Sequence, residues 1–168
     1  RVATQELLLA RREVARTGDA TQMARVELSA CAAQVASLAA TDCPAFAPLA
    51  SDAAPPEKAY AAYLAGKTAG LDGSLLPAAQ AQSLKGNPAL GSIADPLSRL
   101  VAAAVAWRSG RLTREGIAVV IDTAAGEGWR RPLLAWLAVD RDLRRAAGDI
   151  DGAEAAQRRI ERIVSGGK

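Results

Sequence analysis

A short pattern that stops one helix and starts the next occurs near both ends of the chain, and it constrains the fold more than any other feature. Gly18-Asp19 and Gly148-Asp149 each separate two amphipathic segments. Glycine ends helices because it adopts a left-handed backbone without strain, and aspartate caps the first turn of the next helix. A looser copy lies at Gly110. The pattern predicts an all-α chain of antiparallel helical hairpins.

Apolar residues at helical spacing divide the chain into three regions. Residues 1–40 are expected to form a helical hairpin or, if Gly18 lies inside one continuous helix, a coiled-coil arm. Residues 41–94 are rich in proline and glycine, which predicts an irregular connecting region with one short helix at 57–65 and a helical turn near Pro77. Residues 95–164 contain four amphipathic segments, which predict a four-helix module.

The distribution of large apolar residues predicts where the core of this module lies. The helix that follows Pro132 carries the most apolar face of the chain, so we expect it to be the central and most covered helix. Only 4% of the residues are aromatic, and aromatic side chains bury the largest areas. Because Trp129 and Trp136 both lie in the second half, we expect the best-defined core there.

The second hairpin of the module resembles a tetratricopeptide-type repeat. Residues 97–164 are expected to form two consecutive helix-turn-helix units, and the second, from Leu133 to Ile163, carries the resemblance. It rests on the turn at Gly148 and on Ala153, which occupies the small position of the second helix. The chain departs from that family at Arg141, where a glycine or alanine is usual, and at Gln157, where an aromatic residue is usual. The resemblance implies a protein-binding helical repeat and carries over no catalytic residues.

The N-terminal segment has a likeness of its own. Gln5–Leu38 is similar to helical hairpins of membrane-anchored envelope proteins such as the uroporphyrinogen-methyltransferase-like family. The chain begins at Arg1 rather than at methionine, so we expect a signal peptide or membrane anchor to have been removed upstream. An internal domain of a cytosolic protein would begin in the same way. High alanine and arginine content favours a bacterial source.

Composition argues against several classes of function. The chain has no histidine and two cysteines, which removes the commonest general base and metal ligand, so we expect no catalytic residues, no metal and no cofactor. The net charge of +3 arises within 129–168, where acidic residues are interleaved with basic ones. Nucleic-acid binding needs a denser basic stripe and is not expected. The longest apolar run, 100–107, is too short to span a bilayer.

The two cysteines are placed to form a disulfide. Cys31 lies in an apolar helical stripe, and Cys43 follows the end of that helix beside Pro44. If the chain turns back on the helix after Ala40, the two sulfur atoms meet and pin the connecting region. The alternative is that Cys31 is a buried free thiol. A disulfide would favour an extracytoplasmic location, either periplasmic or anchored to the membrane and facing the periplasm, over a cytoplasmic one.

Two groups of side chains are candidates for a partner surface. Tyr60 and Tyr63 lie between two irregular segments, where they either form a peptide-binding groove or pin their helix to the core. The last two helices carry arginines that either form a basic patch for an acidic partner or pair with neighbouring carboxylates. These arginines are Arg141, Arg144, Arg145, Arg158, Arg159 and Arg162. The apolar stripe of the N-terminal helices also predicts a homodimer formed through them.

These patterns favour a non-enzymatic domain of a bacterial envelope protein, which binds or spaces other proteins. The alternative is a cytosolic adaptor or regulator with the same architecture. A third hypothesis is a carboxylate-dependent hydrolase with its pocket in the 66–94 region. Its candidate carboxylates, Asp72, Asp95 and Asp122, lie where helix caps and turns are expected, so no reaction is assigned to them.

Overall fold

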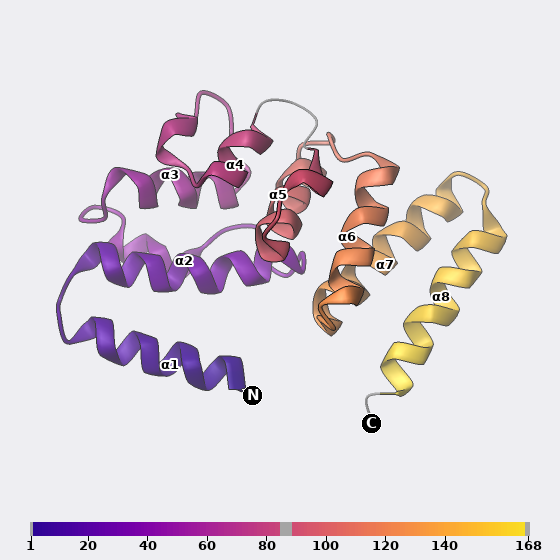
Figure 1. Ribbon diagram of the computed structural model, residues 1–168, viewed down its shortest axis with the longest axis horizontal. Helices are drawn as coiled ribbons and strands as arrows, with labels where there is room; N and C mark the ends of the chain where they lie inside the picture. Colours follow the sequence, from indigo (N-terminus) through magenta and orange to yellow (C-terminus); the bar gives the residue numbers. More distant parts are fainter. Residues whose placement is uncertain (1, 85–88, 167–168) are drawn as a thin grey trace.

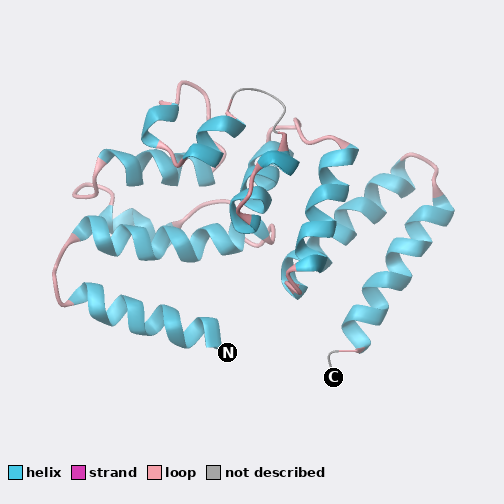
Figure 2. Cartoon of the chain, viewed as in Figure 1, coloured by secondary structure: helices cyan, strands magenta, loops and turns pink. Residues whose placement is uncertain are grey.

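The computed structural model describes residues 2–84 and 89–166, and these residues form an all-α protein with no strand among them (Figures 1 and 2). Three short 3-10 helices lie in the connecting region: η1 (Pro44–Leu49), η2 (Gly73–Leu75) and η3 (Leu90–Ser92). The α-helices are α1 (Val2–Ala15), α2 (Ala20–Ala36), α3 (Pro55–Leu64), α4 (Ala78–Ser83), α5 (Pro96–Arg108), α6 (Arg114–Gly126), α7 (Arg130–Ala146) and α8 (Ile150–Ser165).

The N-terminal region is a hairpin, so the coiled-coil-arm alternative is wrong. Gly18 has a φ of 66°, which ends α1, and the Asp19 carboxylate accepts hydrogen bonds from the backbone N–H groups at the start of α2. Helices α1 and α2 then run side by side in opposite directions (Figure 1). Arg11 on α1 donates to both carboxylate oxygens of Glu27 on α2, at 2.7 and 2.6 Å.

Helix α5, and not α7, is the central helix of the molecule. It packs against α2, α3, α4 and α6, and every residue from Leu100 to Ala106 is buried. These residues are all apolar, so this part of α5 has no polar face to turn toward water. Helix α7 buries only Leu133, Trp136 and Leu137, because its remaining positions include five arginines and two aspartates. The expectation that α7 is the most covered helix is therefore wrong.

The buried core is shared by both halves of the chain. Leu28 and Val35 on α2 and Leu64 on α3 are as buried as the residues of α5 and join the same cluster. Trp136 on α7 is fully buried, and its indole Nε1 donates to the Ala36 carbonyl at the end of α2, at 3.0 Å. The expectation of a core defined mainly in the second half is wrong, because α2 covers α5 and contacts α7.

The connecting region is more regular than its composition predicted. Residues 44–49 form η1, where irregular structure was expected, because proline fits the first turn of a helix. The short helix expected at 57–65 is present as α3, which begins two prolines earlier at Pro55. The expected turn near Pro77 is present as α4. Part of the expected irregular segment, 85–88, lies outside the described residues.

Helices α5 to α8 follow one another as neighbours in the order of the chain (Figure 1). Each turn is short, and at the last one Gly148 has a φ of 79° while the Asp149 side chain caps α8 by accepting from the Gly152 N–H. This arrangement contains the four helices expected in the module over residues 95–164. Identification of the last hairpin as a tetratricopeptide-type repeat stays a prediction.

Cys31 and Cys43 form a disulfide, which was one of the two alternatives that the sequence left open. Their Cα atoms are 5.6 Å apart, and Cys31 is buried in α2 while Cys43 immediately precedes η1. Arg108 fixes the same stretch from the other side, because its guanidinium donates to the carbonyls of Ala40 and Leu64. Burial lowers the pKa of this guanidinium. The disulfide and Arg108 together hold the start of the connecting region against α2 and α5.

Reduction of the disulfide is expected to lower the free energy of unfolding by roughly 2–3 kcal/mol, because the unfolded chain regains the entropy of the closed loop. The measurement is the urea unfolding midpoint, followed by circular dichroism, with and without reductant. The double variant Cys31→Ser/Cys43→Ser serves as the control and should show the lower midpoint in both conditions. Equal midpoints for the oxidised and reduced wild-type protein would contradict the expectation.

Candidate functional site

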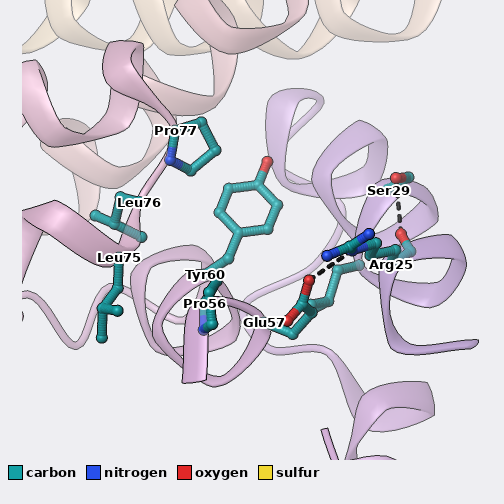
Figure 3. Close-up of a pocket in the computed structure, with 9 residues that line it drawn as sticks. Arg25, Ser29, Pro56, Glu57, Tyr60, Leu75, Leu76 and Pro77 are labelled. Carbon is teal, nitrogen blue, oxygen red and sulfur yellow. Dashed lines mark hydrogen bonds and ion pairs between the residues drawn. The ribbon is translucent and has the colours of Figure 1, made fainter. Parts of the chain in front are cut away.

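A pocket lies between α2, α3 and residues 75–77, which follow the start of η2 (Figure 3). Its volume is about 450 Å³. We call it the α2–α3 groove, and its lining is mainly apolar. The lining residues are Arg25, Leu28 and Ser29 from α2, Pro56, Glu57 and Tyr60 from α3, and Leu75, Leu76 and Pro77.

The third wall of the groove is positioned by a local cap. The Asp72 carboxylate accepts a hydrogen bond from the Ser74 N–H at 2.9 Å, which starts η2 and directs Leu75 and Leu76 to the groove. Hydrogen bonds from the Ser74 hydroxyl and from its N–H lower the pKa of Asp72. Asp95 likewise caps α5 by accepting from the Ser98 N–H at 2.7 Å.

One ion pair lies in the apolar wall of the groove. Arg25 Nε donates to Glu57 Oε1 at 2.6 Å, and this hydrogen bond raises the pKa of Arg25. The Arg25 side chain is 66% exposed, whereas that of Glu57 is 7% exposed. The second carboxylate oxygen of Glu57 is buried without a hydrogen-bond partner. The pair therefore places two opposite charges, which cancel each other, in a mainly apolar surface.

The two tyrosines of α3 have different roles. Their rings stack at 6.4 Å between centroids, but Tyr60 lines the groove whereas Tyr63 is fully buried. The Tyr63 hydroxyl hydrogen-bonds the Ser83 hydroxyl at 2.6 Å, which ties α3 to α4. Tyr63 is thus a core residue, and the prediction that it forms part of a partner surface is wrong. Figure 3 shows the Tyr60 ring between Pro77 and the Arg25–Glu57 pair.

Alkaline pH is expected to destabilise the protein through Tyr60. Burial raises the pKa of Tyr60 to about 12. As pH rises, the Tyr60 hydroxyl therefore ionises at a lower pH in the unfolded chain than in the folded protein. This contribution to stability is present below pH 10 and is lost between about pH 10 and 12. The urea midpoint should therefore fall more between pH 9 and 11 in the wild type than in Tyr60→Phe. A tyrosinate absorbance titration showing an ordinary pKa for both tyrosines would contradict this.

The six predicted arginines do not form one surface. Arg144 and Arg159 line a second hollow between α6, α7 and α8. Arg141 donates to Asp142 and Gln157, and Arg158 pairs with Glu154. Arg144 pairs with Asp140 and Asp149, so the pairing interpretation holds for these three arginines. Arg145 and Arg162 are exposed and line neither of the two pockets that contain Arg144.

The hydrolase hypothesis needs two carboxylates facing one pocket of the 66–94 region. Among the described residues, Glu57 is the single carboxylate that lines the α2–α3 groove. Asp72 and Asp95 are caps, as expected, whereas Asp122 lies within α6 rather than at a helix end.

The described part of the chain contains no cluster of side chains suited to a metal ion. None of its helices is long and apolar enough to cross a membrane.

The groove residues Arg25 and Glu57 were not found from the sequence. The sequence contained a signal for Glu57, because Glu57, Tyr60 and Leu64 recur at the spacing of one helical face and so place a carboxylate on a buried stripe.

No protein-family model, curated protein or solved structure matches this chain. The geometry of the groove is therefore the guide to a function.

Proposed function

We propose that this protein is a non-enzymatic binding domain whose α2–α3 groove accepts an apolar side chain of a partner protein. The observation that carries the proposal is a hollow of about 450 Å³ with leucine, proline and tyrosine in its walls. This volume falls in the range of sites that bury a ligand group. Burial of one large apolar side chain there contributes about 1.5–3 kcal/mol.

The Arg25–Glu57 pair would orient such a segment. Nε of Arg25 is used by Glu57, while the other guanidinium nitrogens donate to no acceptor among the described residues. They are able to donate to a backbone carbonyl of the partner without breaking the pair. Because the charges of the pair compensate each other, a neutral backbone group suits this position better than a second full charge. We therefore infer an extended, apolar partner segment.

The disulfide supports placement in an oxidising compartment, and we propose the bacterial periplasm. Disulfides persist outside the cytosol, where thiols are kept reduced. The check is rapid acid quenching of cells that express the full-length protein, followed by thiol alkylation and mass measurement. A protein with Cys31 and Cys43 both alkylated in the absence of reductant would favour the cytosolic adaptor instead.

The binding proposal is tested by selecting phage-displayed random peptides on the purified protein and measuring their affinity by fluorescence anisotropy. Selected peptides are expected to share a large apolar residue. Leu75→Lys, at a half-buried position of the groove, should weaken them about tenfold or more, because a cation replaces part of the apolar wall. Val164→Lys, an exposed apolar site on α8, is the matched control. Equal binding by both variants would contradict the proposal.

A further inference from the structure

A second groove crosses helices α6, α7 and α8. Two adjoining pockets of about 260 and 200 Å³ share Leu137, Asp140, Arg144 and Arg159, and together we call them the α6–α8 groove. It shares no lining residue with the α2–α3 groove. Its other lining residues are Arg114, Ala118, Ile121, Asp122, Gly152, Ala155 and Ala156.

Small residues of α8 keep this groove open. A Cβ atom at Gly152 would collide with the Asp149 carboxylate and lie 2.7 Å from Arg144 Nη1. The absence of a side chain there lets the Arg144 guanidinium lie against the first turn of α8. Ala155 and Ala156 extend the same wall with little bulk. The floor is apolar, since Leu137 from α7 and Ile121 from α6 line it.

The charges that line the groove are only partly compensated. Arg144 donates to Asp140 at 2.8 Å and to Asp149 at 2.9 Å, which satisfies it on both sides. Arg114 and Arg159 line the same hollow, yet neither forms a hydrogen bond or ion pair with a described residue. The pKa of Asp149 is lowered by the Gly152 N–H, by Arg144 and, at longer range, by Arg114. Arg114 and Arg159 are therefore the two arginines of this groove that pair with no described carboxylate.

We propose that the α6–α8 groove binds an acidic segment of a partner protein. A carboxylate of that segment accepts hydrogen bonds from Arg114 and Arg159, whose planar guanidinium groups suit carboxylate oxygens. An adjacent apolar side chain rests on Leu137 and Ile121. Asp122 at the edge of the groove repels a continuous acidic run, so an isolated acidic residue flanked by apolar ones fits best. This site is independent of the α2–α3 groove.

The test uses a fluorescein-labelled, C-terminally amidated peptide in which two glutamates are spaced by leucine and alanine. Its affinity is measured by anisotropy at low salt and compared with that of the same peptide carrying glutamine at both positions. The glutamate peptide should bind about tenfold tighter or more, and added salt should weaken it. Equal affinity of the two peptides would overturn the proposal.

Charge-matched variants separate the groove from the net charge of the protein. Arg114→Glu/Arg159→Glu should lose binding of the glutamate peptide, whereas Arg145→Glu/Arg162→Glu makes the same charge change outside the groove and should keep it. Ala155→Trp, which fills the hollow without changing charge, should also weaken binding. An equal loss in both double variants would overturn the proposal. Leu75→Lys, which changes the α2–α3 groove, should leave binding of the glutamate peptide intact. The two proposals can therefore fail independently of each other.

Discussion

Replacement of Trp136 by alanine is expected to lower the free energy of unfolding by about 3–5 kcal/mol, which is a large part of the stability of a typical domain. Trp136 is fully buried, and no other fully buried side chain is larger. Its loss leaves a cavity between α7 and α2 and also leaves the Ala36 carbonyl without its indole donor. Urea unfolding followed by circular dichroism measures the effect.

Two variants divide this effect into its parts. Trp136→Phe keeps most of the apolar volume but removes the indole N–H, so a loss of about 1–3 kcal/mol is expected. Trp129→Ala removes a half-buried tryptophan from the start of the same helix and should cost less than Trp136→Ala. If Trp129→Ala proves as destabilising as Trp136→Ala, the contact between α7 and α2 contributes no more to the free energy of unfolding than a half-buried side chain, which would contradict the prediction.

Replacement of Ala103 by glutamate is expected to prevent stable folding. Ala103 is fully buried in α5, within the stretch Leu100–Ala106 in which every residue is apolar and buried. A carboxylate there is dehydrated, which costs several kcal/mol, and its side chain overpacks the core as well. Arg99, one helical turn earlier, already donates to the Ile93 carbonyl and the Thr123 hydroxyl, so a new ion pair would disrupt these contacts. The measurement is the near-ultraviolet circular dichroism signal of the tryptophans, which should be lost, together with the cooperativity of thermal unfolding.

The matched control is Ala118→Glu. Ala118 is an exposed alanine within α6, so the same substitution leaves the new carboxylate in water and should change stability by about 0.5 kcal/mol or less. A cooperative thermal transition in Ala103→Glu close to that of Ala118→Glu would contradict the central position of α5. The comparison distinguishes burial from helix propensity, because both sites lie in helix interiors.

The helices and their ends were predictable because their causes are local. Gly18 and Gly148 end helices, and Asp19 and Asp149 cap the next ones, through contacts within a few residues. The disulfide was one of two alternatives that the sequence offered, since Cys31 and Cys43 are separated by one helix end. The prolines of the connecting region were misleading, because a proline breaks a helix interior but suits the first turn of helices such as η1.

The candidate site was predicted only in part. For Tyr60 and Tyr63 the sequence left a groove role and a core role open, because two tyrosines three residues apart on one helix gave no sign of which would be covered by α4. The apolar run Leu100–Trp107 was visible and was weighed only against a membrane span. Its lack of any polar face was the signal that α5 is central.

The amino-acid sequence alone determined the all-α class and the helix end at Gly148, because capping and backbone preference act between near neighbours. The structure decided the two alternatives that the sequence left open, the hairpin at Gly18 and the disulfide. The tertiary structure decided which helix is central, which tyrosine is covered and which arginines share a groove. Arg25 and Glu57 are 32 residues apart, and Trp136 and Ala36 are 100 apart. Such pairs form only when helices pack, and the side of a helix that is covered depends on its neighbours rather than on its own pattern.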